Sequence, residues 1–277
     1  MPELPEVETT LRGILPHLLG RRVLGVEIRQ RQLRWPVAPE IDHLPGSIVT
    51  GLHRRAKYLL ATISPAPDQP PTGTILIHLG MSGSLRIIEP SAPLRPHDHV
   101  LVTLESGRQL RFHDPRRFGC WLWTAAPADQ HPLLRDLGPE PLSTDFTGAT
   151  LATAARGRRR SIKELILDGK VVVGVGNIYA CEALHLAGIH PKRPAGRVGP
   201  ARLERLADSI RQVLSRAIAS GGTTLRDFLR EDGAPGYFKQ ELLVYDREGE
   251  PCRSCQRPVR RIMLGQRSTF YCPGCQR

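Results

Sequence analysis

Four cysteines near the C-terminus form the clearest chemical pattern in this sequence. They stand in two pairs separated by sixteen residues, Cys252-Arg-Ser-Cys255 and Cys272-Pro-Gly-Cys275. Two Cys-x-x-Cys pairs can place four thiolates in a tetrahedron around one zinc ion. Because four protein ligands leave no open coordination position, one Zn²⁺ is expected to fold this short segment and not to react. Two redox-active dithiols, or thiols without a metal, are the alternatives.

The segment between the two cysteine pairs is basic. It contains Arg257, Arg260, Arg261 and Arg267. A basic hairpin held by zinc is suited to binding phosphates, which position a protein on nucleic acid. Many zinc ribbons bind proteins instead, so the residues alone leave both kinds of partner open.

The N-terminus offers a second reactive group. The chain begins with Met1-Pro2-Glu3, and a small residue after the initiator favours its removal, which would expose the secondary amine of Pro2. An α-amino group titrates near neutral pH, so part of it is an unprotonated nucleophile that can attack a carbonyl-like carbon and form an iminium ion. Glu3 and Glu6 would then be placed to move protons. The alternative is a simply trimmed start whose acids complement a helix dipole.

Both features belong to a longer series of motifs. In chain order the series is Pro2-Glu-Leu-Pro-Glu-Val-Glu8, Arg54-Arg-Ala-Lys57-Tyr, His78-Leu-Gly-Met81-Ser-Gly, Asp114-Pro-Arg116-Arg-Phe118-Gly, Gly174-Val-Gly-Asn177-Ile-Tyr-Ala, Gly221-Gly-Thr-Thr, Pro235-Gly-Tyr-Phe and Gln266-Arg267-Ser-Thr-Phe-Tyr-Cys272. It resembles the bacterial formamidopyrimidine-DNA glycosylases from residue 2 to residue 275. The resemblance implies an enzyme that excises oxidised purines (8-oxoguanine, formamidopyrimidines) from double-stranded DNA. The same enzyme would cut the strand at the abasic site by β,δ-elimination.

The resemblance also implies roles for single residues. Pro2 would be the nucleophile at C1′ of the flipped nucleotide, forming a Schiff base, and Glu3 the general acid. Lys57, expected on a strand, would bind phosphate and assist β-elimination; on the residues alone it is an ordinary solvated lysine. Arg267 would bind the next phosphate and promote δ-elimination, mainly by electrostatic positioning because arginine is hardly ever deprotonated.

Three further residues would fill the space left by the extruded base. Met81 and Phe118 would replace the lost stacking, and the guanidinium of Arg116 would reach the orphaned cytosine. Simple core packing is the alternative for Met81 and Phe118.

The remaining DNA contacts are expected at His97, Arg159 and Asn177. Asn177 follows two glycines at the start of a helix, where free N–H groups suit a phosphate; on the residues alone it is an N-cap. Arg159 lies in an arginine-rich loop where relatives often carry lysines. His97 has a near-equivalent neighbour in His99.

Two alternative functions are compatible with the same motifs. The endonuclease VIII branch shares the chemistry and the zinc hairpin but prefers oxidised pyrimidines. Leu4, where that branch typically has glycine, and the set Met81, Arg116 and Phe118 favour the purine enzyme. The other rival is a non-catalytic zinc-ribbon DNA-binding protein, against which the intact Pro2, Glu3 and Lys57 argue.

Composition agrees with a nucleic-acid partner. Lys and Arg total 39 against 27 Asp and Glu, which gives a formal net charge of +12. Such an excess favours a polyanion bound with counterion release, although an arginine-rich proteome would raise the charge as well. No run of about eighteen apolar residues exists, and the acidic N-terminus is unlike a secretory signal, so no membrane partner is expected. Paired cysteines fit a reduced cytoplasm, and the protein is expected to be a nucleoid-associated monomer.

The N-terminal half reads as one helix followed by strands. The apolar spacing predicts a helix from Leu4 to Leu19 that Pro16 kinks or shortens. Short strands separated by Pro- and Gly-rich turns predict a β-sandwich or flattened barrel. Examples of the expected strands are Val23–Ile28, Tyr58–Ile63, Thr74–His78, Leu85–Ile88, Val100–Leu104 and Trp121–Trp123.

The fold class is therefore α+β with several domains. Residues 1–124 are expected to form a catalytic β-sandwich domain and residues 125–144 a Pro-rich linker. Residues 145–235 are expected to be helical, and the resemblance identifies them as a helix-two-turn-helix DNA-binding domain. They contain a capping box at Ser161–Glu164 and a long helix that opens at Pro200. Residues 236–277 would form the zinc finger.

Overall fold

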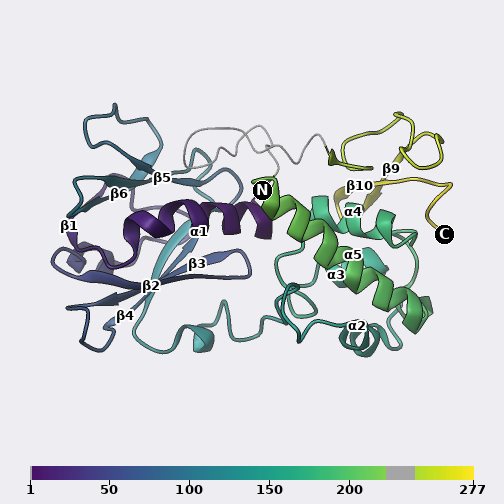
Figure 1. The fold of residues 1–277 in the computed structure, drawn as a ribbon, viewed down its shortest axis with the longest axis horizontal. Helices are drawn as coiled ribbons and strands as arrows, with labels where there is room; N and C mark the ends of the chain where they lie inside the picture. Colours follow the sequence, from purple (N-terminus) through teal and green to yellow (C-terminus); the bar gives the residue numbers. More distant parts are fainter. Residues whose placement is uncertain (1, 223–240) are drawn as a thin grey trace. The chain divides into compact units, whose positions relative to one another are not determined.

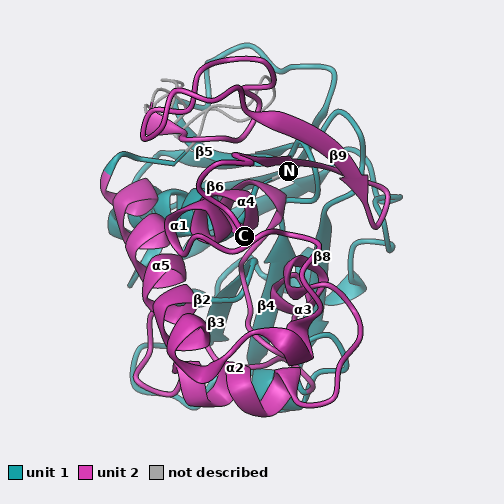
Figure 2. Cartoon of the chain, turned by 90° about the vertical axis from the view of Figure 1, so that its right-hand side faces the viewer, with its two compact units in different colours: residues 1–135, 220–237 teal, residues 136–219, 238–277 magenta. Residues whose placement is uncertain are grey.

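The structure is a computed structural model that describes residues 2–222 and 241–277. It divides into two compact units, one formed by residues 1–135 and 220–237 and the other by residues 136–219 and 238–277 (Figure 2). Met1, the Pro235-Gly-Tyr-Phe motif, the two threonines that follow Gly222 and the expected domain boundary after residue 235 lie outside the described residues. The fold class expected from the sequence, α+β with several domains, is confirmed.

The N-terminal unit is a β-sandwich with one helix at its start (Figure 1). Its two four-stranded sheets have the orders β1-β6-β7-β5 and β2-β3-β4-β8, and every pairing is antiparallel. The elements are α1 (Leu4–Leu18), β1 (Val23–Ile28), η1 (Pro39–His43), β2 (Ile48–Arg55), β3 (Tyr58–Ser64), β4 (Gly73–His78), β5 (Ser84–Ile88), β6 (Asp98–Leu104), β7 (Gln109–His113), β8 (Cys120–Thr124) and η2 (Ala128–Gln130).

Helix α1 covers the sandwich core with one apolar face. Val7, Leu11, Ile14 and Leu18 are buried at helical spacing, as the sequence predicts. Helix α1 ends at Leu18, one residue before the expected Leu19, and contains Pro16 in its last turn. The missing N–H of Pro16 costs the helix one backbone hydrogen bond near its end.

All six strands named as examples are present, and the sheets contain two more, β2 and β7. Both are rich in polar residues, as in His53-Arg-Arg55 and Gln109-Leu-Arg111. They are strands because neighbours on the sheet satisfy their backbone groups: β2 pairs along its length with β3, and β7 lies between β5 and β6. Pairing partners distant in sequence outweigh local propensity here.

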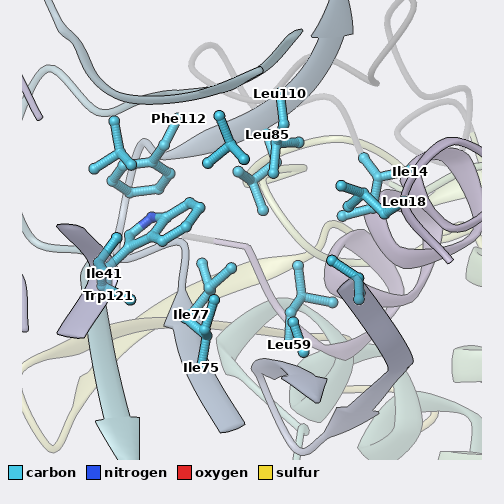
Figure 3. Packing of buried hydrophobic residues seen from close by; sticks show 14 of the residues in the cluster. Ile14, Leu18, Ile41, Leu59, Ile75, Ile77, Leu85, Leu110, Phe112 and Trp121 are labelled. Carbon is cyan, nitrogen blue, oxygen red and sulfur yellow. The ribbon is translucent and has the colours of Figure 1, made fainter. Parts of the chain in front are cut away.

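The core of this unit is apolar and closely packed (Figure 3). Trp121 is 1% exposed and Phe112 is 0% exposed, and their rings meet edge to face at 6.0 Å between centroids. Side chains from α1, including Ile14 and Leu18, join residues of both sheets in the same cluster. This core holds the ends of β4 and β7 and the start of β8, and the loops after β4 and between β7 and β8 are anchored there.

The C-terminal unit contains helices and a two-stranded hairpin. Its elements are α2 (Gly148–Ala155), α3 (Ile162–Ile166), α4 (Asn177–Leu186), η3 (Ala195–Arg197), α5 (Pro200–Ala219), β9 (Arg260–Leu264) and β10 (Arg267–Tyr271). The capping box of α3 is confirmed, since Ser161 and Glu164 bond to each other's backbone N–H groups. Among the described helices none combines the length and apolar character needed to cross a membrane.

Candidate active site and nucleic-acid interface

The N-terminal segment places its candidate catalytic groups at the start of α1. Pro2 is buried directly before the helix, and Glu3, 2% exposed, is the N-cap residue. Glu6 is equally buried, and its Oε2 accepts a 2.8 Å hydrogen bond from the backbone N–H of Glu3. The helix start thus fixes the backbone next to Pro2 and buries two carboxyl groups close to it in the chain.

Arg54 connects α1 to the β2–β3 hairpin. Its Nε donates to Glu8 Oε2 over 2.9 Å, and its Nη1 donates to the carbonyl oxygen of Ala56 over 3.0 Å. Burial alone would raise the pKa of Glu8, but hydrogen bonds and charges from Arg54 and Arg12 outweigh burial and the pKa is lowered. The carboxylate therefore stays ionised and holds the arginine that supports the hairpin turn.

Lys57 lies in that turn and not on a strand, which corrects the sequence expectation. Arg55 pairs with Tyr58, so Ala56 and Lys57 form a two-residue loop, with Ala56 at a φ of 54°. Lys57 is half-buried, unlike an ordinary solvated lysine. Its positive charge adds to the effect of burial in lowering the pKa of His78.

His78, at the end of β4, is a neutral imidazole. Burial lowers its pKa to about 4, and the charges of Lys57 and Arg34 act in the same direction. Its Nδ1 accepts a 2.8 Å hydrogen bond from the backbone N–H of Gly80, and its ring lies 4.8 Å from that of Tyr58. Because Nδ1 is the acceptor, the single proton of the neutral ring is on Nε2.

A cleft of about 730 Å³ adjoins His78. The residues that line it are Gln32, Leu33, Arg34, His78, Gly80, Met81, Arg116, Arg117 and Phe118. Phe118 is 44% exposed, so core packing is wrong for this residue, and Met81 is half-buried at the cleft wall. The guanidinium carbon of Arg116 lies 4.8 Å from the centre of the Phe118 ring. The cleft thus brings together the three residues expected to fill the gap left by an extruded base.

Two loops with special backbone conformations present these side chains. Asp114 to Arg117 form a turn closed by a 3.2 Å hydrogen bond from the N–H of Arg117 to the carbonyl of Asp114, with Pro115 at the position that proline favours. Gly80 has a φ of 67°, and a Cβ there would collide with the backbone of Phe118. The glycine is therefore required where the loops touch.

His97 lies beside the same loops. Its ring is exposed, whereas His99 is 5% exposed and its Nε2 bonds to the carbonyl oxygen of Asp114 over 2.8 Å. The rings of His97 and His99 are 6.0 Å apart. Of these two near-equivalent neighbours, only His97 exposes a side chain that could contact a ligand.

In the C-terminal unit the four cysteines fit one zinc ion. The Sγ atoms of Cys252 and Cys275 are 3.8 Å apart, those of Cys255 and Cys272 are 3.4 Å apart, and all four lie within 4.8 Å of one another. A tetrahedron of Zn–S bonds of about 2.3 Å has edges of about 3.8 Å, so the sulfurs match a structural zinc site. Two redox dithiols would place sulfurs in pairs and not in a tetrahedron.

Arg267 opens strand β10 directly after a tight turn. Leu264 pairs with Arg267, and the two loop residues, Gly265 and Gln266, have φ values of 54° and 58°. Two positive φ values define a type I′ turn, which matches the twist of the paired strands. The side chain of Arg267 is exposed at this end of the hairpin.

Asn177 is the first residue of α4, and the alternative that it is merely an N-cap is wrong because Gly176 is the N-cap residue. Its Nδ2 donates to the carbonyl of Ser268 over 2.9 Å, and its Oδ1 accepts from Lys163 Nζ over 2.6 Å. Lys163 is 1% exposed and also donates to Thr269 Oγ1 over 2.6 Å. This buried lysine joins α3, α4 and the strand that begins with Arg267.

Glu182 anchors the segment that leads into the zinc module. Its carboxylate accepts hydrogen bonds of 2.8, 3.0 and 2.9 Å from the backbone N–H groups of Leu243, Val244 and Tyr245. Burial raises its pKa although these bonds act against the rise.

The candidate DNA contact Arg159 is exposed in the loop after α2.

Four residues with clear positions here had no assigned role from the sequence. Arg54 and Asp114 stood inside recognised motifs, and only that placement hinted at them. Lys163 and Glu182 gave no signal beyond a charged residue among apolar neighbours, which is more often a solvated side chain. Their partners come from other elements, so the folded structure was needed to find them.

Comparison with known proteins gives one consistent result along the chain. A model of the formamidopyrimidine-DNA glycosylase N-terminal domain matches residues 1–121, and a model of the formamidopyrimidine-DNA glycosylase H2TH domain matches residues 137–229. A model of the zinc finger found in FPG and IleRS matches residues 249–277. The three models thus follow one another in the order expected from the sequence motifs.

Relatives match over their whole length. The formamidopyrimidine-DNA glycosylase of Methylococcus capsulatus is 56% identical and that of Thioalkalivibrio sulfidiphilus 57% identical, each with 100% of both chains covered. The solved MutM (Fpg) protein of Thermus thermophilus is 38% identical with a TM-score of 0.87 and coverage of 99% and 98%. A complex of Lactococcus lactis Fpg with DNA containing an abasic site is 32% identical with a TM-score of 0.88 and 99% of both chains covered.

Helix α4 and the zinc hairpin thus have counterparts in the H2TH and zinc-finger models, and the cleft and the Pro2-Glu3 start lie within the N-terminal model. Relatives above half identity extend from one end of the chain to the other. The chain belongs to the formamidopyrimidine-DNA glycosylase family.

Proposed function

We propose that this protein excises oxidised purines from duplex DNA and then cleaves the strand at the resulting abasic site. The observation that carries the proposal is the buried Pro2-Glu3 start on a chain that is 55–57% identical, over its full length, to proteins named formamidopyrimidine-DNA glycosylase. Solved relatives have been captured with DNA containing carbocyclic 8-oxo-G and with abasic DNA. Oxidised purines and abasic sugars are therefore the proposed substrates.

The reaction begins with extrusion of the damaged nucleotide, because C1′ is inaccessible within a stacked duplex. After removal of Met1, the secondary amine of Pro2 attacks C1′, the bond from C1′ to the base breaks, and an iminium ion joins protein and sugar. Glu3 donates a proton during base departure and sugar opening. Its position at the N-cap of α1 keeps this carboxyl group close to Pro2 in the chain.

Strand cleavage follows by elimination from the iminium ion. Loss of the C2′ proton expels the 3′ phosphate, and Lys57 binds phosphate and assists this β-elimination. Arg267 binds the next phosphate and promotes the second, δ-elimination by stabilising the leaving oxyanion. A guanidinium suits this task because it holds two phosphate oxygens at once and stays charged.

The cleft residues support the duplex while the base is out. Met81 and the exposed ring of Phe118 replace lost stacking, and Arg116 offers donors to the orphaned base. His97, Arg159 and Asn177 are proposed to contact the DNA backbone, as is the basic hairpin that the zinc site folds. The bacterial cytoplasm, where chromosomal DNA lies, is the proposed location, and a monomer is the proposed active form.

One activity assay separates this function from its rivals. Duplexes carrying 8-oxoguanine opposite cytosine, an oxidised pyrimidine opposite its partner, and an undamaged control are incubated with excess protein. Faster excision of the oxidised purine, followed by strand cutting, is expected. Preference for the pyrimidine would assign the endonuclease VIII specificity, and binding without cutting would assign a non-catalytic DNA-binding protein.

A further inference from the structure

Asp114 is a completely buried acid at the base of the loops that line the cleft. It is 0% exposed, and its Oδ1 accepts a 2.9 Å hydrogen bond from Ser82 Oγ while its Oδ2 accepts a 2.8 Å bond from the backbone N–H of Gly119. Within the described ranges no lysine or arginine forms an ion pair with this carboxylate. Burying a carboxylate without a cation is costly, so its hydrogen bonds must offset that cost.

The two hydrogen bonds reach the two loops that matter for the cleft. Ser82 is the neighbour of Met81, and Gly119 is the neighbour of Phe118. A Cβ on Gly119 would lie 2.6 Å from the carbonyl oxygen of His78, so the loops touch through backbone and leave no room for a larger link. One carboxylate therefore fixes the spacing between the Met81 and Phe118 loops.

The backbone of Asp114 adds a third connection. Its N–H donates to the carbonyl of His97 over 3.0 Å, and its carbonyl accepts from His99 Nε2 over 2.8 Å. Its carbonyl also closes the turn that ends at Arg117. The proposed DNA contacts around the cleft thus each coincide with, or directly adjoin, a residue bonded to Asp114.

We propose that Asp114 is a positioning residue that sets the relative placement of Met81, Arg116 and Phe118, and with it the recognition of the base opposite the lesion. This inference rests on the proposed function of these three side chains. The carboxylate touches neither DNA nor the reacting atoms. It acts by holding two loops at a fixed separation, so its loss should disturb lesion recognition more than the chemistry at Pro2.

The two oxygens suggest a conservative replacement. In Asp114→Asn the amide oxygen can accept from the N–H of Gly119, and the amide N–H can donate to Ser82 Oγ, because a hydroxyl accepts as readily as it donates. Asp114→Ala keeps neither bond. Ser82→Ala removes only the link to the Met81 loop, and Ser84→Ala is its matched control, since Ser84 is another buried serine of the same segment, 3% exposed.

The experiment measures two ratios for each full-length variant. The first is the excision rate of 8-oxoguanine opposite cytosine divided by the rate opposite adenine, and the second is the lesion excision rate divided by the cleavage rate of a ready-made abasic site. Val100→Ala controls for lost stability, because it shortens a buried core side chain in β6, the strand paired with β7 just before Asp114. Asp114→Ala should bring the first ratio to below about threefold, as expected for loss of Arg116, and lower the second by about tenfold or more, since a misplacement of about 1 Å can cost on the order of 100-fold. Asp114→Asn should stay within about threefold of the wild type, and Ser82→Ala should fall between the two.

The outcomes separate this inference from the function it depends on. If Met81→Ala and Phe118→Ala lower the ratios while Asp114→Ala behaves like Val100→Ala, the positioning role is overturned and the function stands. Should Asp114→Ala fail to fold, Ser82→Ala decides: ratios equal to those of Ser84→Ala contradict the proposal. If Met81→Ala and Phe118→Ala leave both ratios unchanged, the proposed function of the cleft is contradicted, and with it the inference that rests on it.

Discussion

Arg116 is the residue through which the cleft can sense the base opposite a lesion. Its guanidinium offers donors only, and cytosine left without a partner presents O2 and N3 acceptors. Adenine is larger, and the ring of Phe118, 4.8 Å from the guanidinium carbon, limits the space. We expect 8-oxoguanine to be excised about 10- to 100-fold faster opposite cytosine than opposite adenine, since a good direct contact is worth about 1–3 kcal/mol. Arg116→Ala should reduce this preference to below about threefold.

The control for this prediction is Arg108→Ala, which removes the same charge from an arginine whose side chain is 43% exposed and paired with Glu89. It should keep the preference of the wild type. Cleavage of a ready-made abasic site should change little in Arg116→Ala, because that step depends on Pro2. Equal single-turnover rates opposite the two bases in the wild type would remove Arg116 from this role.

His78 is expected to make the stability of the N-terminal unit sensitive to acid. Its pKa in the folded protein is about 4, below the ordinary 6.5, so the unfolded chain binds more protons in this range. Stability therefore rises with pH between these values and is lost as the pH falls from 6.5 towards 4. His78→Asn, whose side-chain oxygen can still accept from the N–H of Gly80, should lose less stability than the wild type between about pH 7 and about pH 5.

Urea unfolding at the two pH values measures this difference directly. His17→Asn serves as the control, because the side chain at this helix position is exposed to solvent. An identical loss of stability in the wild type and His78→Asn would show that His78 is not the group responsible.

At the scale of elements, α1 and the β2–β3 hairpin have to be held together for Pro2 and Lys57 to act on one nucleotide. Arg54 does this through Glu8 and the turn carbonyl of Ala56, with side chains only 10% and 17% exposed for the Arg54–Glu8 pair. Arg54→Met should lower the stability of the unit by about 1.5–3 kcal/mol, as expected for hydrogen bonds to a charged group. It should also slow strand cutting.

Arg12→Met is a closely matched control. Arg12 also pairs with Glu8, at 3.0 Å, but its side chain is 63% exposed and it does not reach the hairpin. Its removal should cost at most about 1 kcal/mol and leave strand cutting unchanged. Equal effects of the two substitutions, measured by thermal unfolding and gel assay, would contradict a special role for Arg54.

The elements also show what local sequence can predict. Apolar periodicity gave α1, six strands and α5, because their buried faces dominate their sequences. It did not indicate β2 and β7, because their polar residues interrupt the apolar pattern. Pairing with neighbouring strands stabilises both. The separate expectation that Lys57 lies on a strand was wrong, because Ala56 adopts a positive φ that sequence rarely signals and the two residues form a turn.

At the scale of the whole molecule, the folding of the zinc segment is expected to be independent of the folding of the β-sandwich. The four ligands and the small apolar cluster around Cys252 lie in the C-terminal unit, whereas the large core with Trp121 lies in the N-terminal unit. Cys272→Ser should lose zinc, weaken DNA binding and slow strand cutting, while near-UV circular dichroism of the sandwich tryptophans is retained. The physical reason is that a short segment without its metal has too small a core to fold.

Cys120→Ala is the control, because it removes a buried thiol from β8 and leaves the ligand set intact. It should retain one zinc per chain by metal analysis and wild-type affinity by fluorescence anisotropy. Full activity of a metal-free protein would contradict the structural role of zinc.

The overall function was predictable because chemistry-bearing motifs run from residue 2 to residue 275 in a single order. The buried polar residues that hold the loops and helices in place could not be predicted in the same way. Asp114, Lys163 and Glu182 act through partners on other elements, and a charged residue gives no local sign that it is buried. Asn177 shows the same limit, since its side chain bonds to Lys163 and Ser268 and does not cap its own helix.

The central claim is that the amine of Pro2 forms a covalent bond with the sugar of the damaged nucleotide. The most direct measurement is borohydride reduction of the protein with a duplex containing 8-oxoguanine opposite cytosine, followed by peptide mass analysis. Mass analysis of the untreated protein first verifies that Met1 is absent, because a retained Met1 would acylate Pro2. The account predicts a trapped complex whose cross-link lies on the N-terminal peptide at Pro2. A cross-link on Lys57, or no complex from protein that lacks Met1, would contradict it.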